Sequence, residues 1–136
     1  MDKLFVDTNI VLDLLQKRED FFEEAQELFT LADRKKVKLF ISSLTIANTH
    51  FLLSKHYNSY EARKILAKFK VLVEVLVLDN KIIDLALVSD LKDFEDAIQF
   101  YTAIENNANI IITRNKKDFK KQNIPILTAK EYLNRK

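Results

Sequence analysis

Glycine and cysteine are both absent from this chain of 136 residues. Loops that cradle phosphates, such as the Walker A and dinucleotide-binding loops, need glycine for close backbone approach, so nucleotide binding of those kinds is excluded. Without cysteine there is no disulfide, no thiolate nucleophile and no cysteine metal site. These two absences alone exclude several classes of mechanism.

Long apolar stretches are lacking as well. The longest strongly apolar stretch, residues 71–78, is short and is interrupted by Glu74, and no basic segment followed by an apolar one opens the chain. We therefore expect neither export nor a membrane span, which makes the cytoplasm the default location. The net charge of +2 does not decide whether the surface binds polyanions. Local clusters of charge are more informative about such binding than the net charge.

The residues that are present favour a helix-rich α/β sandwich. Hydrophobic residues make up 48% of the chain and charged residues 31%, which is typical of a globular domain with one core. Short apolar runs alternate with longer segments of 3.6-residue periodicity, the pattern of strands and crossover helices on a parallel sheet. No linker, repeat or low-complexity segment interrupts it. We expect one domain over residues 1–136.

Five strands and seven helices are expected. The strands lie near 3–6, 38–41, 72–78, 110–113 and 125–127. The helices lie near 9–16, 20–35, 43–57, 60–70, 80–88, 94–107 and 129–134. The only proline, Pro125, falls at the start of the last strand, where a missing amide does least damage.

The first strand stops at Asp7, and a helical pattern begins immediately after it. In open α/β sheets, ligands bind outside the carboxyl ends of the strands, so Asp7 would stand where substrates collect. The alternative is that Asp7, Thr8 or Asn9 merely caps the next helix, since all three residue types are good N-caps.

Two further acidic segments lie near other element ends. Asp93 precedes the helix predicted near 94–107, Asp96 lies in its first turn, and Asp118 follows the strand near 110–113. These segments would meet Asp7 at one edge of the sheet if the first and fourth strands are neighbours. The alternatives are helix capping for Asp93 and Asp96, and a solvated surface turn for Asp118.

Clustered carboxylates repel one another unless they share a proton or a cation. Oxygen ligands without histidine or cysteine suit Mg²⁺ or Mn²⁺, which can lower the pKa of a bound water and stabilise charge on a phosphodiester. Asp7, Asp96 and Asp118 are therefore candidate metal ligands for hydrolytic cleavage of a phosphodiester.

Four segments together resemble the motifs of the PIN domain nucleases, in the order and at the spacing of that family. They are residues 4–12, 41–47, 93–99 and 111–119. The resemblance covers essentially the whole chain. It implies a Rossmann-like three-layer α/β/α fold with an acidic pocket that binds Mg²⁺ or Mn²⁺. It also implies metal-dependent cleavage of RNA, often by the toxin of a bacterial toxin–antitoxin pair, with an antitoxin protein and a homodimer as the partners.

The resemblance also assigns roles to residues. Asp7 matches the first acid of the family and Asp96 the third, while Asn115 and Asp118 share the region that supplies the fourth. These four are the residues that would carry catalysis. Three further residues match the hydroxyl and amide groups that orient acids or waters in the pocket: Thr8, Asn9 and Thr113.

One position departs from the family pattern. The second acid, typically a glutamate, aligns with Asn48, which offers a carbonyl oxygen but no charge. From its spacing of one helical turn before Asp96, we hypothesise that Asp93 restores the missing carboxylate as a metal ligand. A module that binds RNA or protein without cutting stays open as an alternative.

Basic residues surround the fourth segment and would bind phosphates without reading bases. They are Arg114, Lys116, Lys117, Lys120 and Lys121. The alternative is a solvated charged surface. An enzyme that transfers phosphate through an aspartyl phosphate is a further alternative, but such enzymes place a second acid two residues after the first, where this chain has Asn9.

Overall fold

The computed structural model describes residues 1–119 and 123–135. The side chain of Asp118 lies outside the described part, as do Lys120 and Lys121. The strands are β1 (Lys3–Val6), β2 (Lys38–Ser42), β3 (Glu74–Leu76), β4 (Ile110–Ile112) and β5 (Ile126–Leu127). The α-helices are α1 (Thr8–Leu15), α2 (Phe22–Asp33), α3 (Ser43–His56), α4 (Ser59–Phe69), α5 (Asn80–Leu87), α6 (Phe94–Glu105) and α7 (Ala129–Leu133). Two 3-10 helices, η1 (Lys70–Leu72) and η2 (Lys116–Phe119), complete the described elements.

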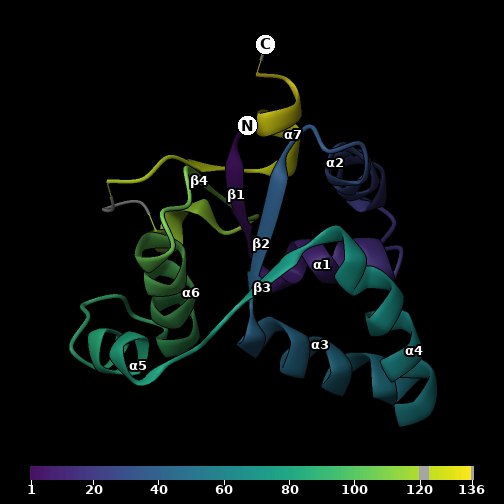
Figure 1. Cartoon of the computed structure of the whole chain (residues 1–136), viewed down its shortest axis with the longest axis horizontal. Helices are drawn as coiled ribbons and strands as arrows, with labels where there is room; N and C mark the ends of the chain where they lie inside the picture. Colours follow the sequence, from purple (N-terminus) through teal and green to yellow (C-terminus); the bar gives the residue numbers. More distant parts are fainter. Residues whose placement is uncertain (120–122, 136) are drawn as a thin grey trace.

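The five strands form one parallel sheet in the order β3-β2-β1-β4-β5. Figure 1 shows α5 and α6 on one side of this sheet and α1, α2 and α4 on the other. The predicted three-layer α/β fold with a five-stranded parallel sheet is confirmed. The pairing of β1 with β4 also fulfils the condition for the acidic segments to meet at one edge.

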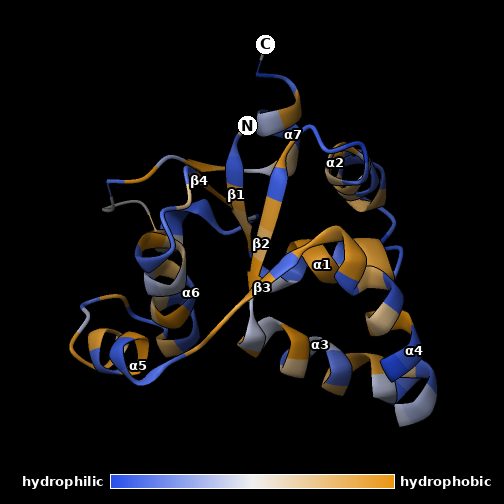
Figure 2. Cartoon of the chain, in the orientation of Figure 1, coloured by the Kyte–Doolittle hydropathy of each residue, from blue (hydrophilic) through white to orange (hydrophobic). Residues whose placement is uncertain are grey.

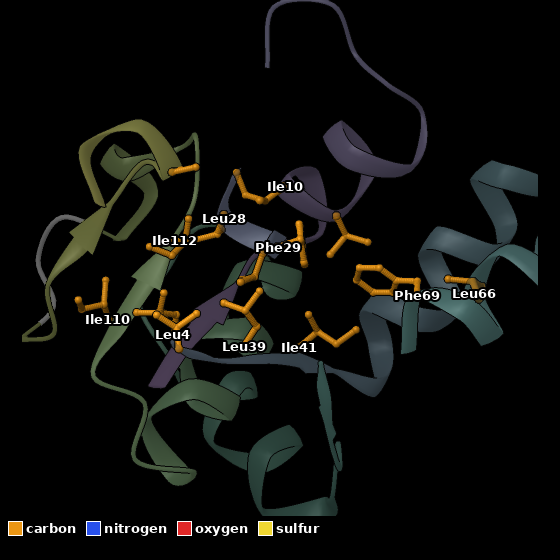
Figure 3. Packing of buried hydrophobic residues seen from close by; sticks show 14 of the residues in the cluster. Leu4, Ile10, Leu28, Phe29, Leu39, Ile41, Leu66, Phe69, Ile110 and Ile112 are labelled. Carbon is orange, nitrogen blue, oxygen red and sulfur yellow. The ribbon is translucent and has the colours of Figure 1, made fainter. Parts of the chain in front are cut away.

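Alternate residues of the strands point to opposite helical layers, as the two-residue period of a strand requires. Leu4 and Val6 of β1 join the larger hydrophobic cluster with α1, α2 and α4, as Figure 3 shows for Leu4, while Phe5 joins a second cluster with α6. Each fully buried large side chain contributes roughly 1.5–3 kcal/mol. Burial on both faces explains why these strands read as continuous apolar runs.

Polar side chains fix where most of the helices begin. Six helices have an N-cap side chain that accepts a hydrogen bond from a backbone N–H of the first turn. These caps are Asp7, Ser42, Asn58, Asp79, Asp93 and Thr128. Asp7 and Ser42 directly follow or end neighbouring strands, so the same two side chains also mark the carboxyl edge of the sheet.

The predicted strand over 72–78 is wrong in extent. Lys70–Leu72 form a 3-10 turn, and only Glu74–Leu76 pair with β2. The physical reason is that β3 is an edge strand, held by the last three residues of β2 alone, while Val71 is 82% exposed. The other predicted elements agree with the structure to within about two residues, the usual uncertainty of helix ends.

Three helices end in residues with positive φ, a conformation that usually falls to glycine. In this chain without glycine they are Lys17 (φ 49°), Lys35 (φ 59°) and Asn107 (φ 59°). Asparagine tolerates this region because its short polar side chain can hydrogen-bond locally, whereas lysine has no such compensation for the steric clash of its Cβ carbon with the backbone.

Hydrophobic residues concentrate toward the middle of the molecule. In Figure 2 the central part of β2 is hydrophobic, whereas α2 and α6 carry both hydrophilic and hydrophobic residues. None of the helices in the described ranges is long and apolar enough to cross a membrane.

Candidate active site

Asp7 lies at the middle of the carboxyl edge of the sheet, directly after β1. On either side of β1 the strand order runs in opposite directions, which makes the β1/β4 junction the switch point where open α/β sheets bind ligands. The backbone N–H of Asp7 donates to the carbonyl of Ile112 at 3.0 Å, which extends the pairing of β1 with β4. Asp7 is only 7% exposed.

Both carboxylate oxygens of Asp7 accept hydrogen bonds. Oδ1 accepts from the backbone N–H of Thr8 at 2.8 Å, which is the capping bond of α1. Oδ2 accepts from the hydroxyl of Thr113 at 2.8 Å. Oδ1 therefore caps α1, as the capping alternative expects. Oδ2 is oriented by Thr113, the residue directly after β4. Two such bonds fix the carboxylate in one orientation, which a metal ligand needs.

Thr113 connects Asp7 to the loop that follows β4. Its side chain is fully buried, and its single hydroxyl proton is donated to Asp7. The same oxygen accepts from the backbone N–H of Asn115 at 3.1 Å. One hydroxyl thus sets the position of Asn115, whose side chain is exposed, relative to Asp7.

The first turn of α6 carries Asp96, which is partly buried. Asp93 is exposed, and its Oδ1 accepts from the N–H of Asp96 at 2.9 Å, so Asp93 is the N-cap of this helix. One turn after Asp96, the side chain of Gln99 donates to the hydroxyl of Thr8 at 3.1 Å. This bond joins α6 to the residue next to Asp7, so that both helices begin at the same edge.

Asn48, on α3, contacts an acid that sequence reasoning missed. Its Nδ2 donates to Oε1 of Glu95 at 2.7 Å. The carboxylate that reaches Asn48 is therefore that of Glu95, whereas Asp93 caps the helix. The available signal was the position of Glu95 beside Asp96, but spacing within a helix does not tell which residue faces α3.

Asp13 is a second acid that the sequence did not single out. It is 1% exposed on α1, with Nη2 of Arg114 donating to its Oδ1 at 3.1 Å and Nη1 of Arg18 at 3.6 Å from the same oxygen. Burial raises the pKa of Asp13, and the attraction of Arg114 and Arg18 acts in the opposite direction. Arg18 also donates to Oδ1 of Asn9 at 3.3 Å, so this cluster supports a residue beside the site.

The predicted phosphate-binding residues differ in their surroundings. The guanidinium of Arg114 pairs with Asp13 and lies 3.9 Å from the centre of the Phe21 ring. Lys116 pairs with Glu131 at 2.9 Å, and both side chains are more than 40% exposed. Lys117 is exposed. The charge of Arg114 is therefore paired with a buried acid, whereas the charges of Lys116 and Lys117 lie at the surface.

The donor types at this edge fit Mg²⁺ or Mn²⁺. Asp7 and Asp96 offer carboxylate oxygens, the Thr113 hydroxyl donates to Asp7, and the Thr8 hydroxyl accepts from Gln99, one turn after Asp96. Within residues 1–119 and 123–135, excluding the side chain of Asp118, no three histidine, aspartate or glutamate side chains gather closely enough to hold a metal. Magnesium needs only one or two carboxylates together with waters and substrate phosphates, so this arrangement suits it better than a closed protein cage.

Comparisons with known proteins agree with this architecture. Ribonuclease VapC1 of Aquifex aeolicus (strain VF5) is 27% identical over 142 residues, which cover 98% of this chain and 95% of that protein. A toxin–antitoxin complex from Klebsiella pneumoniae contains a chain of similar structure, with a TM-score of 0.68 and 25% identity over 93% of this chain and 97% of the other. VapBC2 from Rickettsia felis, bound to a DNA fragment from its promoter, gives a TM-score of 0.67 at 22% identity, over 92% and 96%.

A family model described as the PIN domain matches residues 3–117, which include all the described site residues discussed above. The match spans most of the chain and four of the five described strands, β1 to β4. This chain belongs to the PIN domain family.

Proposed function

We propose that this protein is an endoribonuclease that depends on a divalent metal ion and acts as the toxin of a toxin–antitoxin pair. The observation that carries the proposal is the buried Asp7 carboxylate at the β1/β4 switch point, oriented by Thr113 and adjoined by the helix that carries Asp96. Similarity to a protein named ribonuclease VapC1 supports RNA as the substrate.

In this proposal, Asp7 and Asp96 would hold Mg²⁺ or Mn²⁺, and Asn115 and Asp118 would be the further catalytic residues. The bound ion supplies positive charge that stabilises a phosphodiester during hydrolysis. Thr113 keeps the Asp7 carboxylate oriented through its 2.8 Å hydrogen bond. Thr8 and Asn9 present polar groups at the start of α1, next to the same carboxylate.

Phosphates of the RNA are expected to follow the loop after β4. Lys117 is exposed there, and Lys116 forms a solvated ion pair with Glu131, a kind of pair that contributes little to stability and exchanges readily. Lys120 and Lys121 belong to the same proposed surface. Arg114, paired with Asp13, contributes to the shape of this loop.

The partner class follows from the relatives. The similar chain from Klebsiella pneumoniae was solved in a toxin–antitoxin complex, which supports an antitoxin protein as a partner. A homodimer, a single domain over residues 1–136 and a location in the cytoplasm belong to the same proposal.

The direct test is cleavage of a structured RNA in the presence of Mn²⁺ or Mg²⁺. Asparagine is as good an N-cap as aspartate, so Asp7→Asn keeps α1 capped while removing the charge. The matched control is Asp79→Asn, because Asp79 caps α5 through a 3.0 Å bond to Ile82. We expect Asp7→Asn to lower the rate at least about 100-fold, the upper end of the cost of losing a group that supports a metal site. Asp79→Asn should leave the rate unchanged.

Two outcomes would contradict the proposal. Cleavage that survives in Asp7→Asn, or that persists in excess EDTA, would exclude Asp7 as a ligand of an essential metal. Binding of RNA by the wild-type chain without metal-dependent turnover would favour a module that binds without cutting, the alternative raised by Asn48.

A further inference from the structure

Gln99 is a buried amide in the first half of α6, next in sequence to buried hydrophobic residues. It is 4% exposed on α6, and its helical neighbours Ala97, Ile98 and Phe100 are buried hydrophobic residues. We propose that Gln99 is a positioning residue that fixes the distance between Asp96 and Asp7, and so sets the affinity of the site for its metal ion. This inference rests on the proposed function.

The Gln99 amide bonds three other elements at once. Its Oε1 accepts from the hydroxyl of Ser42, at the end of β2, at 2.7 Å. Its Nε2 donates to the hydroxyls of Thr45 on α3 at 3.0 Å and Thr8 on α1 at 3.1 Å. The hydroxyls of Thr8 and Thr45 lie 2.9 Å apart, which closes the network. Ser42, Thr45 and Gln99 are at most 4% exposed.

The direction of these bonds can be assigned from the donors available. The Ser42 proton goes to the Gln99 carbonyl oxygen, and both Nε2 protons go to the threonine hydroxyls. One proton, from either Thr8 or Thr45, then suffices for the contact between these two hydroxyls. The amide thus supplies one acceptor and two donors, a combination that no carboxylate and no hydroxyl offers.

Both ends of this network lie beside a proposed metal ligand. Thr8 follows Asp7 directly, and its backbone N–H donates to the Asp7 carboxylate. Asp96 precedes Gln99 by three residues, so the two share one side of α6. A shift of Gln99 would therefore move Asp96 relative to Asp7. Burying a polar group costs free energy that an apolar side chain would not, so packing alone does not explain an amide at this position.

The test compares Gln99→Met with a matched control on the same helix. Methionine is unbranched and similar in length but forms no bonds of this kind. Thr102→Val removes a buried hydroxyl that bonds only within α6, to the carbonyl of Ile98 at 2.7 Å. The first readout is the Kd for Mn²⁺ by titration calorimetry of the folded protein.

We expect Gln99→Met to weaken Mn²⁺ binding about 10-fold or more, as groups behind metal ligands commonly do, and Thr102→Val to change it less than about twofold. Thr45→Val removes one Gln99 partner and should weaken binding in the same direction. Thr45→Val thus tests the proposal even where Gln99→Met does not fold. An unchanged Kd in Gln99→Met, or in Thr45→Val alone, would overturn the positioning role.

A second readout separates this inference from the proposed function. If the wild-type chain does not bind Mn²⁺, the metal-dependent function itself is overturned. In the metal-free protein, Gln99→Met should still speed hydrogen exchange of the Thr8 and Thr45 amides, which donate to Asp7 and Ser42. Exchange equal to that of Thr102→Val would overturn the positioning role without any reference to metal.

Discussion

Asp7 shows how one side chain combines a structural role with the chemical role proposed for it. One oxygen caps α1 and the other accepts from Thr113, so the residue that begins a helix is also held in place at the edge of the sheet. Capping and ligation were competing explanations of the sequence. The geometry makes them compatible, because capping uses a single oxygen and fixes the direction of the other.

Asn48 gives a prediction at the level of single side chains. Its amide donates to Glu95 at 2.7 Å, so Asn48→Glu would set two carboxylates against each other. We expect this variant to lower the free energy of unfolding by about 1 kcal/mol and to reduce cleavage of RNA, although it restores the acid typical of the family. Adding Glu95→Gln recreates the bond with donor and acceptor exchanged and should recover most of the loss.

Urea unfolding of the four proteins in this double-mutant cycle measures the coupling. Additive effects of the two substitutions would show that the Asn48 and Glu95 side chains do not interact. A gain of activity in Asn48→Glu alone would show that the position accepts a second metal-binding acid.

Asp13 gives a second prediction of this kind. Asp13→Ala leaves the Arg114 and Arg18 guanidinium groups without their buried acceptor and should cost about 2 kcal/mol of unfolding free energy. Asp13→Asn keeps an acceptor oxygen and should cost less, because burial raises the pKa of Asp13 and thus disfavours its charge in the folded protein.

The same shift fixes a pH dependence. A carboxyl whose pKa is raised on folding contributes stability that is fully present below its ordinary pKa of 3.8 and is lost as the pH rises through the raised value. The stability of the wild-type chain relative to Asp13→Asn should therefore increase as the pH falls through that window. A difference that shrinks on acidification would contradict the direction of the shift.

The control for the Asp13 substitutions is Lys64→Ala, which removes an exposed ion pair with Glu61. It should change the free energy of unfolding by less than about 0.5 kcal/mol.

Among the helices and strands, the absence of glycine has a measurable cost. Lys35 follows the C-cap of α2 with φ 59°, and the N–H groups of Lys35 and Lys36 donate to the carbonyls of Ala32 and Leu31. This bonding closes the helix as a glycine usually does. Lys35→Gly should therefore raise the free energy of unfolding by about 0.5–1 kcal/mol, because it removes the steric cost of the left-handed conformation.

The control for this substitution is Lys36→Gly, one residue further along. Lys36 does not have a positive φ, so glycine there only adds freedom to the unfolded chain and should be neutral or destabilising. Chemical denaturation of both variants decides the point. Destabilisation by Lys35→Gly would show that the lysine side chain contributes more than its backbone conformation costs.

For the molecule as a whole, the fold was predictable because the strands carry a strong signal. Ile110, Ile111 and Ile112 are buried from both sides of the sheet, which requires a continuous apolar run, and the run stops where the site begins. The segment near 71–78 has a similar composition but lies at the edge of the sheet, so its length could not be read from hydrophobicity alone.

The candidate site was predictable only in part. Asp7, Asp96 and Thr113 follow from strand ends and from family motifs, which are local in sequence. Glu95 and Gln99 were missed because their roles depend on which face of α6 meets α3 and the sheet. That orientation arises from packing between segments about 50 residues apart, and no local pattern encodes it.

A crystal structure of the protein soaked with Mn²⁺, recorded with anomalous scattering, would locate the bound ion. We predict a peak coordinated by the carboxylates of Asp7 and Asp96 that disappears in Asp7→Asn but stays in Asp79→Asn. Mn²⁺ bound elsewhere, or a peak that remains in Asp7→Asn, would contradict the claim that the carboxyl edge beside β1 is a metal-dependent active site.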